Sequence, residues 1–197
     1  MISPSAAIDR LKEGNQRFVT ETSIFPNVSG DRRVETTHKK QTPFAAVLTC
    51  SDSRTPPEYI FDQGLGDLFV VRNAGNVCDN SVIASMELAV EHLHVPLIVI
   101  MGHRKCGAVE MAANNISISD NLNKLNHKIK PAIMQAKQDL PHASHAEFLE
   151  HASKLNTQNT LEEITDESSL IRKKLKEGVV EIKAAYYDIE SGEVEWL

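Results

Sequence analysis

The sequence predicts an α/β fold in which a central, mostly parallel β-sheet is flanked by helices. Residues 44–49 and 97–101 form two apolar runs without alternation of polar and apolar positions, which is typical of strands buried on both faces. Between them, residues 81–94 carry apolar side chains at helical spacing and are followed by Pro96. A strand, a helix and a strand in this order predict a parallel pair joined by a right-handed crossover.

Length and composition predict one domain, residues 1–197, with enough apolar residues, 41%, to form a core without stabilising cross-links. The net charge of −6 argues against nucleic acid or an anionic membrane as the main partner. No apolar run approaches the roughly 20 residues that span a bilayer, and the N-terminus lacks a signal-peptide pattern. We therefore expect a cytoplasmic protein, with a periplasmic location as the alternative if a leader has been removed. Three cysteines, an odd number, argue against a disulfide framework.

The N-terminal part is expected to be a helix followed by an extended arm. Ser3 and Pro4 have the pattern of an N-cap and a first helical position. Because this helix carries few apolar residues, we expect it to pack on a neighbouring subunit instead of its own core. Residues 22–42 show no periodicity and are expected to be an extended arm or loop. Residues 1–42 together are expected to lie at an oligomer interface.

The C-terminal part is expected to contain helices and then a hairpin. Thr160 and Glu163 have the spacing of a capping box, which predicts that a helix begins there, and Gly178 is expected to end it. The elements expected after the first strand are, in chain order, a short helix after Pro56-Pro57, a strand at 68–71, the helix at 81–94, a strand ending at His103, a helix at 105–114, helical pieces within 115–158, a helix at 161–175, and an edge hairpin of strands at 179–187 and 194–196.

Four potential metal ligands follow the two buried strands. Cys50 and Asp52 come after the first strand, and His103 and Cys106 come at the end of the second. Because the carboxyl ends of parallel strands meet at one edge of a sheet, we expect these side chains to converge. Two thiols, an imidazole and a carboxylate are a tetrahedral ligand set for zinc. Small buried core residues are the alternative interpretation of Cys50 and Cys106. Cys78 has no such partner and is expected to be a buried core residue.

Three strings of residues resemble the β-class carbonic anhydrases. They are Cys-Ser-Asp-Ser-Arg at 50–54, Val-Val-Arg-Asn at 70–73 and Gly-His-x-x-Cys-Gly at 102–107, and the resemblance runs from roughly Ala6 to Ala113. It implies a lyase, carbonate dehydratase, that catalyses the reversible hydration of carbon dioxide to bicarbonate and a proton with Zn²⁺ as cofactor. The sparsely apolar N-terminal helix and the arm at 22–42, which need a surface to cover, predict a homodimer or homotetramer. Zinc lowers the pKa of a bound water toward about 7 and thereby supplies hydroxide at neutral pH.

The same resemblance assigns roles around the metal. It implies that zinc is held by Cys50, His103 and Cys106. It further implies two states of Asp52: a catalytic one, in which its carboxylate pairs with Arg54 and accepts a hydrogen bond from hydroxide, and a closed one, in which it binds zinc as a fourth ligand. An incidental ion pair in a surface turn is the alternative interpretation of Asp52 and Arg54.

Further positions match substrate contacts of the family. Gln41 matches a glutamine that binds substrate, often across the dimer interface. Phe69, Ala74 and Gly107 match residues that line the small apolar pocket for carbon dioxide, which has neither charge nor dipole. His92 resembles a proposed proton-shuttle histidine, and its ordinary pKa near 6.5 suits a relay. A polar loop residue, an ordinary core phenylalanine and a boundary histidine are the alternatives for Gln41, Phe69 and His92.

The sequence also departs from the family pattern. Ala74 is smaller than the valine or isoleucine often found there, and Leu88 stands where many relatives have tyrosine. Val47 replaces the tryptophan of members with a regulatory bicarbonate site, so that inhibition is not expected although Arg72 is present. Two other functions remain open: a carbonyl sulfide or carbon disulfide hydrolase, which shares the metal motif, and a non-catalytic zinc-binding module. Arg54 argues against the module, because a purely structural site needs no cation to hold a carboxylate away from zinc.

Overall fold

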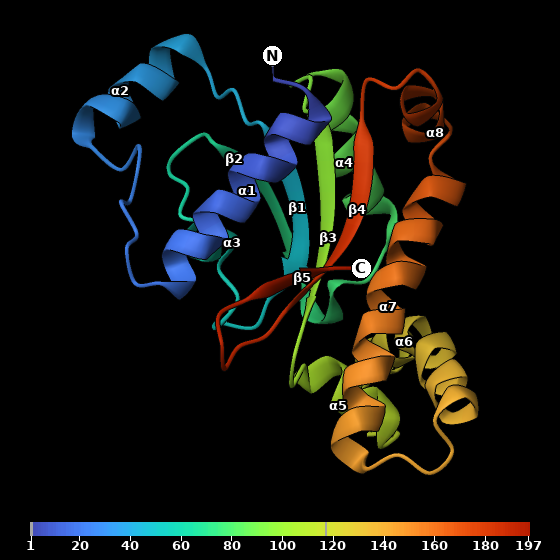
Figure 1. Cartoon of the computed structure of the whole chain (residues 1–197). Helices are drawn as coiled ribbons and strands as arrows, with labels where there is room; N and C mark the ends of the chain where they lie inside the picture. Colours follow the sequence, from blue (N-terminus) through green and yellow to red (C-terminus); the bar gives the residue numbers. More distant parts are fainter. Residues whose placement is uncertain (1, 117) are drawn as a thin grey trace.

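A five-stranded sheet forms the centre of the computed structural model, which describes residues 2–116 and 118–197. Its strands lie in the order β2-β1-β3-β4-β5, with parallel pairing of β1 with β2 and β3 and of β3 with β4, and antiparallel pairing of β4 with β5. The predicted parallel sheet with a C-terminal edge hairpin is thus confirmed (Figure 1). The strands are β1 Ala45–Cys50, β2 Leu68–Asn73, β3 Leu97–His103, β4 Glu181–Tyr187 and β5 Val194–Trp196.

Helices cover both faces of this sheet (Figure 1). The elements α1 and α3 pack on one face, α4, α7 and α8 pack on the other, and α5, α6 and the start of α7 lie beyond the carboxyl ends of β1 and β3. The helices are α1 Pro4–Val19, α2 Gly30–Lys39, α3 Pro57–Ile60, the 3₁₀ turn η1 Ala74–Asn76, α4 Asn80–Glu91, α5 Gly107–Ala113, α6 Asp120–Asp139, α7 His145–Glu167 and α8 Ser169–Lys176.

The two central strands show why their sequences lack alternation. Every residue of β1 and β3 is buried. In β1, Ala45 and Val47 belong to the core under α1, whereas Ala46 and Leu48 belong to the core under α4 and α8. Since both faces of the strand are covered, both sets of side chains must be apolar.

The helix α1 begins as predicted, with the Ser3 side chain accepting a hydrogen bond from the Ala6 backbone N–H at 3.1 Å. However, Ala7 and Leu11 are fully buried against the sheet of the same chain. The expectation that α1 packs on a neighbouring subunit instead of its own core is therefore wrong. Asn15 compensates for the few apolar residues, because its buried side chain hydrogen-bonds the backbone of both α3 and the β4–β5 hairpin.

The expected extended arm contains the helix α2. Its N-cap is Ser29, whose hydroxyl accepts from the Arg32 N–H at 3.1 Å, and Arg32 also donates to the Leu65 carbonyl at 3.0 Å. No residue of α2 is buried in the chain, so the sequence carries no apolar periodicity that would predict this helix.

The C-terminal helices also differ from the expectation. Ser144 and Glu147 form the capping box that begins α7, and Thr160 lies buried within that helix instead of at its start. The helix expected over 161–175 is interrupted at Ser168, whose ψ of 104° is extended and whose hydroxyl caps α8. Thr160 is thus a buried residue of a continuous helix, and the capping pattern that it forms with Glu163 in the sequence marks no helix terminus.

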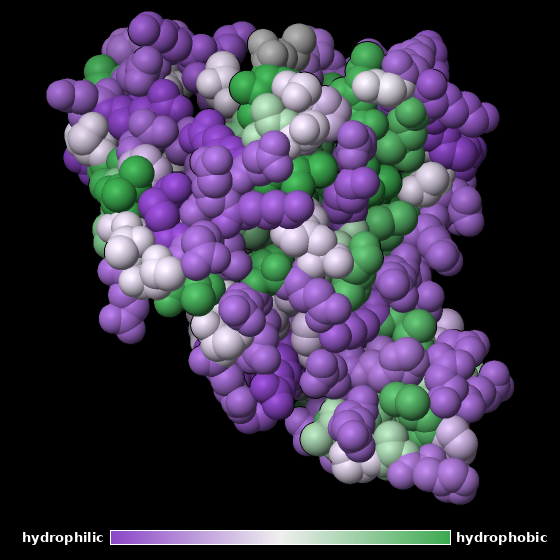
Figure 2. Space-filling model, in the orientation of Figure 1, coloured by the Kyte–Doolittle hydropathy of each residue, from purple (hydrophilic) through white to green (hydrophobic). Residues whose placement is uncertain are grey.

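The molecular surface is largely hydrophilic on the face in Figure 2, and its hydrophobic residues lie in separate groups. Among the described residues, no helix has both the length and the apolar character that crossing a membrane requires.

Candidate metal centre

Three potential ligands converge at the carboxyl ends of β1 and β3. The Sγ atoms of Cys50 and Cys106 lie 3.9 Å apart. With a ring nitrogen of His103 they form a cluster whose ligand atoms all lie within 4.8 Å of one another, and all three residues are buried. Cys50 ends β1, His103 ends β3, and Cys106 is the N-cap of α5. Parallel pairing of β1 with β3 brings the two strand ends together, as the sequence pattern predicts.

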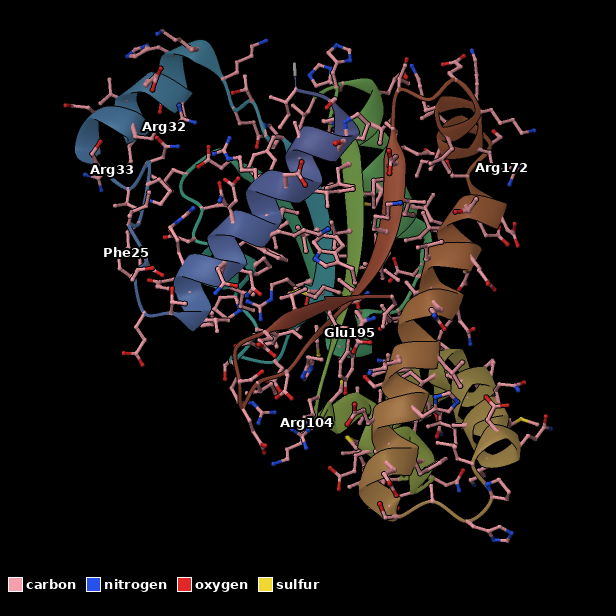
Figure 3. All side chains as sticks on the ribbon, in the orientation of Figure 1. Phe25, Arg32, Arg33, Arg104, Arg172 and Glu195 are labelled. Carbon is pink, nitrogen blue, oxygen red and sulfur yellow. The ribbon has the colours of Figure 1, made fainter. Side chains whose placement is uncertain are left out.

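The orientation of His103 leaves one nitrogen for a metal. Its Nδ1 lies 2.9 Å from the Arg104 carbonyl oxygen, which can only accept, so Nδ1 carries the proton. The Nε2 atom is buried without a hydrogen-bond partner among the described residues. Figure 3 shows Arg104 beyond the end of β3, where its guanidinium pairs with Asp188 at 3.0 Å. A bare imidazole nitrogen beside two sulfurs is a donor set for a metal.

The spacing of the sulfurs agrees with zinc. Two thiolates bound tetrahedrally at about 2.3 Å from one zinc ion are separated by roughly 3.8 Å. The separation of 3.9 Å between the Cys50 and Cys106 Sγ atoms matches this value. Zinc therefore fits the residues at this site.

Hydrogen bonds favour a thiolate at Cys50. The pKa of Cys50 is lowered to about 4, chiefly by the hydrogen bond from the Cys106 thiol, against the opposing effect of burial. His103 and the backbone N–H groups of Gly75 and Asp52, which lie 3.3 and 3.4 Å from the Cys50 Sγ, contribute to this lowering. In the metal-free protein Cys106 retains the shared proton, because its hydrogen bond to Cys50 and burial raise its pKa.

Asp52 lies beside the cluster with its carboxylate held by Arg54. The Arg54 Nε and Nη2 atoms donate to the two carboxylate oxygens at 2.9 and 2.7 Å, and the Arg54 backbone N–H donates at 3.0 Å. These hydrogen bonds hold the pKa of Asp52 well below its usual range, so the carboxylate stays ionised. The cluster of potential ligands among the described residues does not include Asp52. The structure thus has Asp52 in the arginine-paired arrangement.

Arg72 and Thr55 fix the loop that carries Asp52, a role the sequence did not indicate. Arg72 donates to the carbonyl oxygens of Cys50 and Asp52 at 3.0 and 2.6 Å. The Thr55 hydroxyl donates to the same two carbonyls at 3.1 and 2.9 Å. Because these contacts are to backbone atoms, no pattern of neighbouring residue types identifies them.

Two of the four expected substrate residues lie near the cluster. Ala74 follows β2 directly beyond Asn73, which pairs with Cys50, and Gly107 follows Cys106. Both are exposed, whereas the three potential ligands are buried. Phe69 pairs with Ala46, four positions before Cys50, which puts it about 13 Å away along the strand direction.

The other end of the sheet holds Gln41. It precedes β1 and lines a cavity of about 720 Å³ together with Leu88, His92, Arg33 and Lys40. The five steps from Ala45 to Cys50 alone span about 17 Å. Gln41 and His92 are therefore not brought to the metal cluster of their own chain.

Comparisons with known proteins agree with this site. The family model described as carbonic anhydrase matches residues 45–194. A carbonic anhydrase of Mycolicibacterium smegmatis is 35% identical, covering 98% of this chain and 93% of the relative. Carbonic anhydrase 2 of Mycobacterium tuberculosis H37Rv is 35% identical, covering 96% and 91%.

Solved structures extend the likeness to the fold. The β-carbonic anhydrase CafA of Aspergillus fumigatus has a TM-score of 0.78 at 30% identity, covering 98% of this chain and 89% of that one. A tetrameric β-carbonic anhydrase of Sordaria macrospora has a TM-score of 0.78 at 27% identity, covering 85% and 87%. A match over most of the chain, relatives of nearly equal length and a shared fold lead to one conclusion: this chain belongs to the carbonic anhydrase family, in its β class.

Proposed function

We propose that this protein is a zinc-dependent carbonic anhydrase, which catalyses the reversible hydration of carbon dioxide to bicarbonate and a proton. The observation that carries the proposal is the bare, buried Nε2 of His103 beside two cysteine sulfurs 3.9 Å apart. The carbonic anhydrase names of its relatives support the same activity.

The residues of the site have separate roles in this reaction. Zinc, when bound, supplies a water of lowered pKa and hence a hydroxide nucleophile near pH 7. Cys50, His103 and Cys106 bind the ion, and the His103 Nδ1–H bond to the Arg104 carbonyl keeps Nε2 aimed at it. Asp52 accepts a hydrogen bond from the attacking oxygen, which orients the lone pair of that oxygen toward the carbon of carbon dioxide.

Arg54 determines whether the Asp52 carboxylate is paired with a guanidinium or is free to bind the metal. Its two parallel hydrogen bonds to the carboxylate compete with the metal for the same oxygens. Breaking them would free Asp52 to become a fourth ligand, and that closed arrangement remains a prediction. The observed pairing favours a catalytic site over a permanently closed structural one.

The substrate pocket requires a second copy of the chain in this proposal. Ala74 and Gly107 line it from the chain that holds the ion, and at Gly107 even a Cβ atom would meet nothing within 4 Å, which leaves room for a small apolar molecule. Gln41 and Phe69 would be contributed by the second copy, because both lie remote from their own cluster. We therefore propose a homodimer or a homotetramer, with the exposed parts of residues 1–42 at the interface.

The free thiols and the net charge bear on the cellular location of the protein and on its partners. We propose a cytoplasmic location for this single domain, since three free cysteines suit a reducing compartment. The periplasm is the alternative. The net charge of −6 supports the absence of nucleic acid and membrane partners.

Zinc content and turnover, measured on matched cysteine variants, test the proposal. We expect one zinc per chain, with carbon dioxide hydration by stopped flow that chelation abolishes and zinc restores. Cys106→Ala should lose both zinc and turnover. Cys78→Ala is the control, because Cys78 is equally buried but lies in the core under α4, and it should retain both.

Other outcomes discriminate among the functions. Hydrolysis of carbon disulfide without hydration of carbon dioxide would favour the hydrolase. Bound zinc without turnover of either substrate would favour a non-catalytic module. A folded protein without affinity for zinc would overturn the proposal altogether.

A further inference from the structure

The helix α7 packs against the end of β3 with a polar face. Ser153, Asn156, Thr157 and Thr160 are each at most 3% exposed, although they lie on a helix that covers the sheet. The helix comes very close to the strand at Gly102, where a Cβ atom would lie 2.1 Å from the Thr157 Oγ1. Glycine beside the metal ligand His103 therefore permits this close approach.

Two of these side chains reach the backbone of the metal centre. The Ser153 hydroxyl donates to the His103 carbonyl oxygen at 3.1 Å. The Asn156 Nδ2 donates to the Gly75 carbonyl oxygen at 2.9 Å. Both contacts join residues far apart in sequence, and both are shielded from water.

Gly75 is the link between α7 and the thiolate. Its backbone N–H donates to the Cys50 Sγ at 3.3 Å. Its φ of +72° belongs to the left-handed region, and a Cβ atom there would lie 3.0 Å from the Ile129 side chain, so both conformation and packing favour glycine. The N–H and the carbonyl of Gly75 belong to the two peptide planes that meet at its Cα, so a hydrogen bond that holds the carbonyl restricts the φ and ψ on which the direction of the N–H depends.

We propose that Asn156 is a positioning residue for the metal centre, which aims the Gly75 N–H at the Cys50 sulfur. The inference rests on the proposed zinc site. A hydrogen bond to a ligating sulfur withdraws charge from it and orients its lone pairs, and such outer contacts change metal affinity by roughly 10- to 100-fold. Ser153 supports the same arrangement from the His103 side.

The test compares the same substitution at two buried asparagines. Asn156→Leu keeps the γ-branched shape of the side chain, removes the donor and leaves the Gly75 carbonyl without its partner. Asn15→Leu is the control, because Asn15 is also buried and bonded to backbone carbonyls, but in α1, at the β4–β5 hairpin. Both variants are expected to lose stability, and only the first should alter the metal centre. Asn156→Ser, which is too short to reach, serves if leucine prevents folding.

Two measurements report on the metal itself. Competition with a chelator should give a zinc affinity roughly 10- to 100-fold lower for Asn156→Leu than for wild type, and unchanged for Asn15→Leu. In the protein loaded with cobalt(II), the thiolate-to-metal charge-transfer band should move to lower energy in Asn156→Leu, because the sulfur lone pair loses its hydrogen bond.

The outcomes separate this inference from the proposed function. If the wild type binds no zinc, the proposed function fails. If the wild type binds zinc but Asn156→Leu has the same affinity and the same cobalt band, the positioning role is wrong. Equal weakening by Asn15→Leu would attribute the effect to stability alone and would also overturn the inference.

Discussion

Asp52 is a charged residue whose carboxylate is held in one direction by a single neighbouring side chain, that of Arg54. The Arg54 guanidinium donates to both carboxylate oxygens and the Arg54 backbone N–H donates a third hydrogen bond. The Asp52 side chain therefore has one favoured orientation. The pKa of Asp52 lies well below the usual range because of this pairing. Its charge is therefore constant throughout the neutral range, and changes of activity there must arise from other groups.

Asp52→Asn should separate metal binding from catalysis. The amide is nearly isosteric but carries no charge, and it can turn its NH₂ group toward the attacking oxygen, where a hydrogen-bond acceptor is needed. We expect zinc content to be unchanged and turnover to fall by at least about 10²-fold. Metal analysis and stopped flow check this. The exposed Asp166→Asn is the control, and unchanged turnover in Asp52→Asn would remove this residue from the mechanism.

The convergence of Cys50, His103 and Cys106 could be predicted because each residue type is chemically distinctive and lies at, or within three residues after, the end of a recognisable strand. The backbone contacts of Gly75 and Asn156 could not. A backbone N–H exists at nearly every position, so its contacts leave no trace in the sequence. Asn156 lies within the segment 115–158, and the sequence of that segment does not show which part of the chain its helices pack on.

At the scale of elements, Asp62 connects the segment after α1 to the end of α3 through hydrogen bonds. Its side chain is fully buried and accepts hydrogen bonds from the Arg17 Nε at 2.6 Å and from the backbone N–H groups of Ile24 and Phe25 at 3.1 and 2.9 Å. Figure 3 shows Phe25 on the connection between α1 and α2. Burial alone would raise the pKa of Asp62, but these bonds outweigh it and lower the pKa.

The stability contributed by Asp62 should depend on pH. Since its pKa is lower in the folded than in the unfolded chain, the contribution is complete above the ordinary value of about 3.9 and is lost as the pH falls through the folded value. We expect Asp62→Asn to reduce the free energy of unfolding by about 1.5–3 kcal/mol at pH 7, and by less in acid. Urea unfolding across the pH range measures this, and a difference that grows in acid would contradict it.

Element boundaries could be predicted where an apolar face marks them. The strands, α1 and α4 carry such faces and were predicted, whereas α2 has no buried residue and was not. The helix α7 contributes polar side chains to the core, and the pattern at Thr160 therefore suggested a helix start inside a continuous helix. Buried polar residues weaken the periodicity from which helices are recognised.

At the scale of the whole molecule, complementation can test whether Gln41 of one chain completes the site that contains Cys106 of another. We expect Gln41→Ala and Cys106→Ala each to be impaired when expressed alone. A mixed dimer would join the intact metal cluster of the first variant to the intact Gln41 of the second, and should recover turnover at one of its two sites. Co-expression with two different affinity tags isolates this species for stopped flow.

Failure of the mixed species to exceed the two parents would contradict the shared pocket. A mixed dimer of Cys106→Ala with Cys50→Ala is the control, because neither chain then holds a complete cluster and no rescue is expected.

The exposure of α2 offers a way to follow the assembly of the protein. Its residues Gly30–Lys39 have no buried side chain in the single chain, and helices this short are only marginally stable in water without a surface to rest on. Deuterium should therefore replace its amide protons quickly in separated chains. If two molecules associate through α2, its amide exchange should become slow as the protein concentration rises, while exchange elsewhere in the chain stays the same. The exchange rate of this helix would therefore report on association.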